Sequence, residues 1–200
     1  MNILLDQLPT AVEVGGKMYD IPTDFRTAIR LEMLMTDIQL EDTEKLLQIL
    51  LLFFPDIALL SDKVEQAMIA IMDFYRCGKE TAAQKNIGVN KRTQIYSFEH
   101  DAPYIYAAFL EQYGVDLTQE PSLHWWRFKA MFDSLSEKTQ FVKIMGYRSM
   151  VITNDMSPQQ KEFYRRMQKL YAIPVSKTEQ EKINELEQVL LNGGDISKLL

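Results

Sequence analysis

Residues 97–114 read SFEHDAPYIYAAFLEQYG, residues 122–132 read SLHWWRFKAMF and residues 141–148 read FVKIMGYR. The three segments lie in the region Ser97–Arg148, which contains both tryptophans and both histidines of the chain. Aromatic side chains each bury a large apolar area, so a region that concentrates them is expected to hold the core. The sequence therefore predicts that the rest of the chain is organised around this region.

Each of the three segments carries the signals of a helix, because its apolar residues recur at helical spacing. Asp101 precedes Pro103, a residue favoured in the first turn, and the predicted helix ends at Gly114. A second helix is expected from Ser122 and a third from Ser136. The core region should therefore be helical.

Residues 11–21, AVEVGGKMYDI, have the pattern of a β-hairpin. Gly15-Gly16 can adopt the positive φ angles of a two-residue turn, which would place Val12 opposite Tyr19. Two strands alone are only marginally stable, so the apolar face of this hairpin should pack on helices. The hairpin could also be a tight surface turn that serves only the structure and has no functional role.

Helical spacing also follows the hairpin. Helices are predicted over 24–38, with Thr23 as the cap, over 44–54, and from residue 61 or 62 to Tyr75, with Gly78 ending the last one. The segment 44–54, EKLLQILLLFF, is apolar on nearly every side. Such a helix is buried either by neighbouring elements or by a partner chain.

Polar residues fill the segment 79–96, which indicates an exposed connection, and Ser157-Pro158 marks the start of another helix. The predicted architecture is mainly α, with about seven or eight helices and a small N-terminal β-hairpin. We expect one helical domain over 1–172, followed by a C-terminal helix and tail over 173–200.

Composition narrows the class of protein. The formal net charge is −6 and the pI is about 5.1, which argues against general binding of nucleic acid or of anionic membranes. Cys77 is the only cysteine, so no intrachain disulfide can form. The N-terminus does not resemble a secretory signal, and no apolar run could span a bilayer. These features predict a soluble, cytoplasmic protein.

Signals of catalysis are sparse. His100 and His124 lack the cysteine or glutamate partners of a metal site, and Cys77 follows a helix end that disfavours a thiolate. No phosphate-binding or nucleophile-elbow motif is present. We therefore expect no catalytic residues, no metal and no cofactor. The basic residues of 161–169 are expected to form either a solvated face or a dock for an acidic partner.

Several segments together resemble one family of tailed-bacteriophage proteins, the phage Gp15 family of long-tailed phages and prophages of Gram-positive bacteria. The resemblance rests on TDFR (23–26), YSFEHDAPYIYAAF (96–109), YGVDL (113–117), LHWWRFKAM (123–131) and IMGYRS (144–149), together with an F-Y-x-x-G helix end (74–78). It covers about residues 3–172 and excludes the final helix.

The resemblance implies a non-enzymatic role in tail morphogenesis. The family's gene usually precedes the tape measure gene, a position typical of tail assembly chaperones, which keep the tape measure protein soluble before the tail tube polymerises. The implied partners are the tape measure protein and possibly the tail tube protein, in the host bacterial cytoplasm, and self-association is an open option. The alternative is a structural tail or connector component retained in the virion.

A chaperone of this kind needs an apolar surface that accepts amphipathic helices. Its candidates are the second predicted helix and the tryptophan segment, although the same residues could equally form the core. The candidate partner-binding residues are Leu50, Phe53, Phe54, Trp125, Trp126, Phe128 and Met131.

Overall fold

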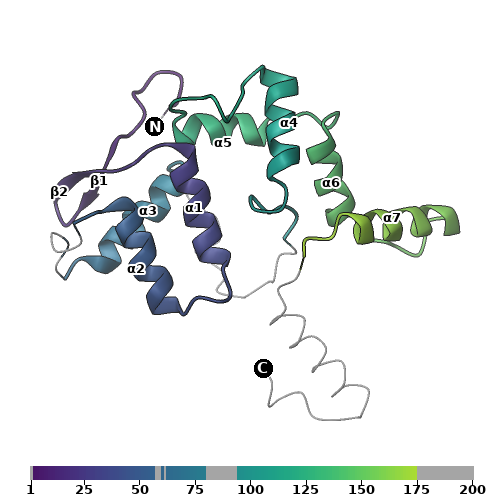
Figure 1. Cartoon of the computed structure of the whole chain (residues 1–200), viewed down its shortest axis with the longest axis horizontal. Coiled ribbons are helices and arrows are strands. Elements are labelled where there is room, and N and C mark those ends of the chain that lie inside the picture. The colour runs from purple at the N-terminus through teal and green to yellow at the C-terminus, as the bar shows by residue number, and fades with distance from the viewer. Residues whose placement is uncertain (1, 57–59, 61, 80–93, 175–200) are drawn as a thin grey trace, which may run out of the picture.

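The computed structural model describes residues 2–56, 60, 62–79 and 94–174. Within these residues the chain forms one hairpin and seven helices (Figure 1). The elements are β1 (Ala11–Val14), β2 (Lys17–Asp20), α1 (Phe25–Thr36), α2 (Asp42–Phe53), α3 (Val64–Tyr75), α4 (Ala102–Tyr113), α5 (Trp125–Asp133), α6 (Gln140–Ser149) and α7 (Pro158–Leu170). The predicted mainly α fold with an N-terminal hairpin is confirmed.

The hairpin has the predicted register. Val12 lies opposite Tyr19, and the turn uses Gly15 at φ 58° and Gly16 at φ 80°, angles that a residue with a Cβ adopts only with strain. Val14 is fully buried, and β1 packs against α3. The apolar face of the hairpin therefore docks on a helix, as the marginal stability of two isolated strands requires.

Four helices begin later than the sequence predicts, among them α3, which starts at Val64 instead of at residue 61 or 62. Asp24, not Thr23, caps α1, because its carboxylate accepts the backbone N–H of Arg26 at 3.0 Å. The segment before α5 is extended and bridges Asp24, so this helix starts after His124 instead of at Ser122. Thr139 caps α6, because residues from Ser136 to Thr139 form a turn first.

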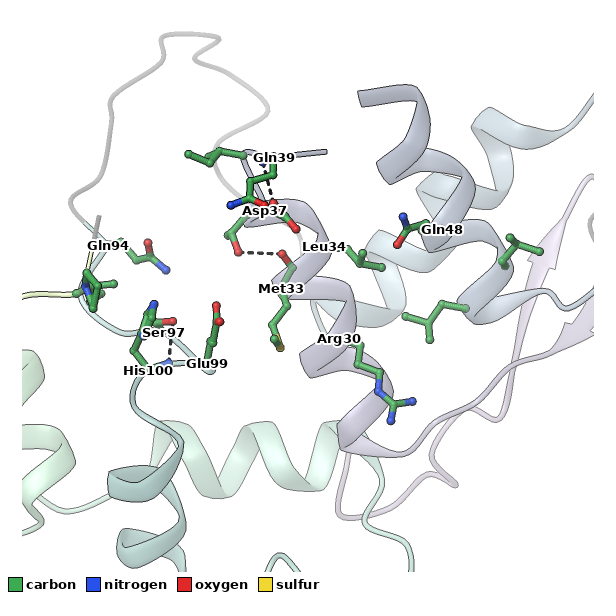
Figure 2. Close-up of a pocket in the computed structure, with 16 residues that line it drawn as sticks. Arg30, Met33, Leu34, Asp37, Gln39, Gln48, Gln94, Ser97, Glu99 and His100 are labelled. Carbon is green, nitrogen blue, oxygen red and sulfur yellow. Dashed lines mark hydrogen bonds between the residues drawn. The ribbon is translucent and has the colours of Figure 1, made fainter. Parts of the chain in front are cut away.

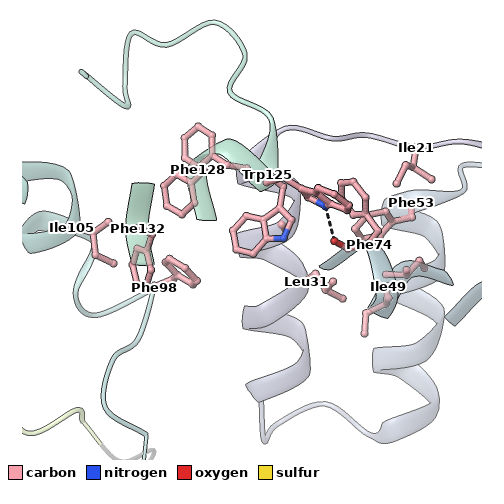
Figure 3. Packing of buried hydrophobic residues seen from close by; sticks show 14 of the residues in the cluster. Ile21, Leu31, Ile49, Phe53, Phe74, Phe98, Ile105, Trp125, Phe128 and Phe132 are labelled. Carbon is pink, nitrogen blue, oxygen red and sulfur yellow. Dashed lines mark hydrogen bonds between the residues drawn. The ribbon is translucent and has the colours of Figure 1, made fainter. Parts of the chain in front are cut away.

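The buried side chains form one continuous cluster that reaches from the hairpin to α6 (Figure 3). Phe128 of α5 lies at its centre, stacked between Phe25 of α1 and Phe109 of α4 at centroid distances of 4.8 and 4.9 Å. In this way α5 joins the half of the molecule that holds α1–α3 to the half that holds α4 and α6 (Figure 1). The aromatic region is the core, as predicted.

A buried ion pair stabilises the half of the molecule that holds α4 and α6. Arg148 at the end of α6 donates to both carboxylate oxygens of Asp101, at 2.6 and 2.9 Å, and also to the carbonyls of Ile95 and Tyr171. Asp101 in turn accepts the backbone N–H of Ser97. The pair therefore ties the ends of α4, α6 and α7 together.

The predicted connection over 79–96 lies largely outside the described residues, and so does the predicted final helix. The helix from Pro158 is present as α7, with a complete capping box at Ser157. The domain boundary near residue 172 stays a prediction.

Candidate functional site

The residues that the sequence nominated as a partner surface lie in the core. The side chains of Leu50, Phe53, Phe54, Trp125, Trp126 and Phe128 are buried, and Met131 is partly buried. A side chain packed inside the core cannot reach a partner in this conformation. In this conformation the six buried residues form part of the core, the alternative that the sequence left open, and partner binding through the seven residues stays a prediction.

The N–H group of each indole also forms a hydrogen bond within the protein. Trp125 Nε1 donates to the carbonyl of Tyr75 at 2.7 Å, and Trp126 Nε1 donates to the carbonyl of Phe74 at 2.8 Å. Both carbonyls lie in the last turn of α3, and that of Phe74 also accepts the backbone N–H of Cys77 at 3.0 Å. The tryptophan pair thus locks α5 onto the end of α3.

Three of the segments that carry the family resemblance meet at one junction. Asp24 caps α1 and also accepts the N–H of Leu123, while the N–H of Phe25 donates to the carbonyl of Leu123 at 2.9 Å. Arg26 donates to the carbonyls of Leu117 and Glu120, both at 2.8 Å. TDFR, YGVDL and LHWWRFKAM are therefore parts of one structural joint.

His124 belongs to this joint. Its Nδ1 accepts the N–H of Trp126 at 3.1 Å, which caps α5, and its Nε2 lies 3.0 Å from the carbonyl of Pro9. Because a backbone carbonyl only accepts, Nε2 must carry the ring proton. Both nitrogens are thus used in holding the fold.

The thiol and the second histidine form no reactive constellation in the described structure. Burial raises the pKa of the Cys77 thiol to about 11, so the thiolate is scarce at neutral pH. His100 is exposed and far along the chain from Cys77. Among the described residues, no group of three or more His, Cys, Asp or Glu side chains could hold a metal ion.

A half-buried carboxylate joins three elements near the centre. Glu32 of α1 accepts hydrogen bonds from the hydroxyls of Tyr75 and Tyr96, and Tyr75 also stacks on Trp125. Burial raises the pKa of Glu32, while the two hydroxyls act against this rise. The three side chains connect α1, the end of α3 and the segment before α4.

The described structure contains a groove that the sequence did not indicate (Figure 2). It encloses about 910 Å³ between α1 and α2 on one side and residues 94–100 on the other. The last described residues, Ile173 and Pro174, complete its wall.

Apolar side chains from α1, α2 and the connection between them line this groove. Ile38 is 51% exposed and Leu51 is 48% exposed, although both are large aliphatic residues. Polar side chains stand around them, so orientation-dependent contacts are available at the rim. The aliphatic lining is Met33, Leu34, Ile38, Leu51, Leu52 and Ile173, and the polar groups are Arg30, Asp37, Gln48, Gln94, Glu99 and His100.

The sequence held a weak signal for this groove. Leu51 and Leu52 lie in the segment 44–54, and a helix that is apolar on nearly every side can bury only part of its surface against α1 and α3. The remaining part is the groove wall. Its second wall comes from residues 94–100, which are distant in sequence and could not be paired with α2 without the structure.

No helix in the described part of the chain is both long and apolar enough to cross a bilayer. No curated protein and no solved structure matches the chain. A family model described as Bacteriophage Gp15 protein matches residues 4–173, which include every described element. The chain therefore belongs to the bacteriophage Gp15 family, and it is a phage structural or morphogenesis protein.

Proposed function

We propose that this protein acts in phage tail morphogenesis as a non-enzymatic chaperone. It binds apolar helical segments of the tape measure protein and keeps them soluble in the host bacterial cytoplasm until the tail tube polymerises. The observation that carries the proposal is the aliphatic groove between α1, α2 and residues 94–100.

The groove has the chemistry of a helix-binding site. An amphipathic helix inserts apolar side chains at positions i, i+3, i+4 and i+7 into a hydrophobic groove. Met33 adds a flexible and polarisable side chain, which adapts to varied apolar partners. Burying one large aliphatic side chain of the partner contributes about 1.5–3 kcal/mol, so a few such contacts support useful affinity.

Electrostatics supports the same role. The formal charge of −6 opposes aggregation of the chaperone itself and gives no general attraction to nucleic acid. Arg30 and His100 at the rim can pair with acidic positions of a bound helix, and Asp37 and Glu99 with basic ones. Because the rim carries both positive and negative side chains, it can accept partner segments that differ in charge.

The test is co-expression with the cognate tape measure protein. Wild-type protein should raise the soluble fraction of the tape measure protein and co-purify with it, and Leu51→Glu should abolish both effects. Leu110→Glu is the matched control, because Leu110 is 44% exposed on α4, away from the groove. Equal behaviour of the two variants, or no effect of the wild type, would reject the proposal.

Mass spectrometry of purified virions separates this role from the alternative. A chaperone is released before the tail is complete, so virions should contain essentially none of it. Stoichiometric amounts would instead favour a structural tail or connector component.

A further inference from the structure

Charge is distributed unevenly along the described chain. Residues 2–56, which form the hairpin, α1 and α2, hold ten Asp and Glu side chains against four Lys and Arg side chains. α7 holds four basic side chains and one acidic one. These two parts lie on opposite sides of the molecule (Figure 1). The protein thus has an acidic side and a basic arm.

α7 is an arm because little of it is covered. None of its residues is buried, and it packs on α6 through Tyr147, which contacts Phe163, and through Gln168, which donates to the carbonyls of Tyr147 and Met150. Phe163 remains 40% exposed and Leu170 remains 64% exposed. An ordered, well-capped helix with this much apolar surface is typical of a docking element.

The exposed face of α7 has a defined pattern. Phe163, Arg166 and Leu170 occupy positions i, i+3 and i+7, so they lie on one side of the helix. In the described part of the chain, Arg166 forms no ion pair. The face therefore offers Leu170 and the part of Phe163 that Tyr147 leaves uncovered, on either side of Arg166.

The exposed face of α2 carries the opposite charge. Glu44, Leu47 and Leu51 also occupy positions i, i+3 and i+7, and all three are exposed. The acidic residues Glu41 and Asp42 precede them at the start of the helix. Asp42 pairs with Lys45 of the same helix at 3.7 Å, whereas Glu41 and Glu44 form no ion pair in the described part of the chain. The exposed apolar residues of α2 thus lie beside negative charge, and those of α7 lie beside positive charge.

We propose that α7 of one copy packs against the α2 face of a second copy. α2 and α7 lie on opposite sides of the molecule (Figure 1), so the opposite charge of their exposed surfaces points to contact between two copies. Apolar contact between the helix faces supplies the attraction, and the charges of Arg166 and Glu44 fix the orientation. The interface is heterologous, because different surfaces of the two copies meet. It can therefore extend into a chain or close into a ring.

Self-association goes beyond the proposed chaperone role and does not depend on it. Leu51 belongs both to the α2 face and to the groove lining, so a docked α7 competes with any other helix at that edge. The arm itself takes no part in the groove of its own copy in the described structure.

Sedimentation analysis of the isolated full-length protein tests the inference with two variants. Phe163→Glu/Leu170→Glu removes the apolar arm but keeps the α2 face, and Leu47→Glu/Leu51→Glu removes the α2 face but keeps the arm. The mean mass of the wild type should rise with protein concentration, and high salt should weaken this rise because the charges are exposed. Each variant alone should stay monomeric, since losing one such apolar contact weakens association about tenfold or more.

Mixing the two variants in equal amounts gives the decisive result. The intact arm of one should dock on the intact α2 face of the other. The two remaining surfaces have both lost their apolar residues, so the mixture should stop at dimers. Leu110→Glu should associate like the wild type. A wild type that stays monomeric, variants that associate normally, or a mixture that stays monomeric would overturn the inference. None of these outcomes involves the tape measure protein, and the arm variant should still co-purify with it if the chaperone role holds.

Discussion

Removal of the Arg148 side chain should strongly destabilise the protein. Arg148 makes four hydrogen bonds, two to Asp101 at 2.6 and 2.9 Å and one each to the carbonyls of Tyr171 and Ile95 at 2.6 and 3.1 Å. The side chains of Arg148 and Asp101 are only 8% and 2% exposed, so solvent cannot replace the lost partners.

The magnitude follows from this burial. In Arg148→Met the Asp101 carboxylate keeps only the N–H of Ser97, and two carbonyls lose their donor. Breaking one side of a buried pair costs about 3–5 kcal/mol, a large share of the roughly 5–15 kcal/mol that stabilises a typical domain. Arg148→Lys should fall between this variant and the wild type, because an ammonium retains the charge but cannot replace the planar, bidentate contact.

Urea unfolding followed by tryptophan fluorescence measures the effect, since both indoles lie in the core. Asp101→Asn/Arg148→Met should cost clearly less than the two single substitutions added together, by about 1–3 kcal/mol of coupling, because the double variant leaves no buried charge unpaired. A loss below about 0.5 kcal/mol for Arg148→Met, the range of ordinary surface substitutions, would refute the reasoning. A double variant whose loss of stability equals the sum of the two single losses would also refute it.

Three further perturbations test individual residues. The raised pKa of Glu32 means that the folded state holds its proton more tightly than the unfolded state, so the contribution of Glu32 to stability should fall as pH rises from about 4.5 through the raised pKa. Glu32→Gln should remove this dependence, which denaturation over a pH series would measure; identical pH profiles would contradict it. Cys77, with a pKa of about 11, should react with iodoacetamide at pH 8 about two orders of magnitude more slowly than free cysteine, and a rate near that of free cysteine would show that the thiol is not desolvated. His124→Ala should lose about 1 kcal/mol of unfolding free energy with the α5 cap, whereas His124→Asn, which can still cap, should lose less; equal losses would contradict the capping role.

The sequence predicted those parts of the fold that depend on local signals. The Gly15-Gly16 turn fixes its own register, and Pro103 and Gly114 bound α4 by their backbone preferences alone. The starts of α1 and α5 were predicted less well because each is set by a contact with the other: Asp24 holds Leu123 extended across about a hundred residues of sequence. Such long-range capping leaves no local pattern.

The candidate site was the least predictable part, for a related reason. Trp126 and Leu51 are both large residues expected to avoid water, and only packing decides that the first is buried under the end of α3 while the second faces a groove. The sequence shows which residues are apolar, but it does not show which of them are covered by other side chains in the folded chain. The surplus apolar residues of 44–54 are those that the other elements fail to cover.

Hydrogen exchange tests the central claim, that the exposed aliphatic groove of α1 and α2 is the working surface, most directly. The protein is measured alone and in complex with the co-purified tape measure protein, and amide protection is compared segment by segment. Exchange should slow across residues 30–39 and 48–52 in the complex, with no change across α6. Unchanged exchange in those two segments, with new protection elsewhere in the chain, would contradict the claim.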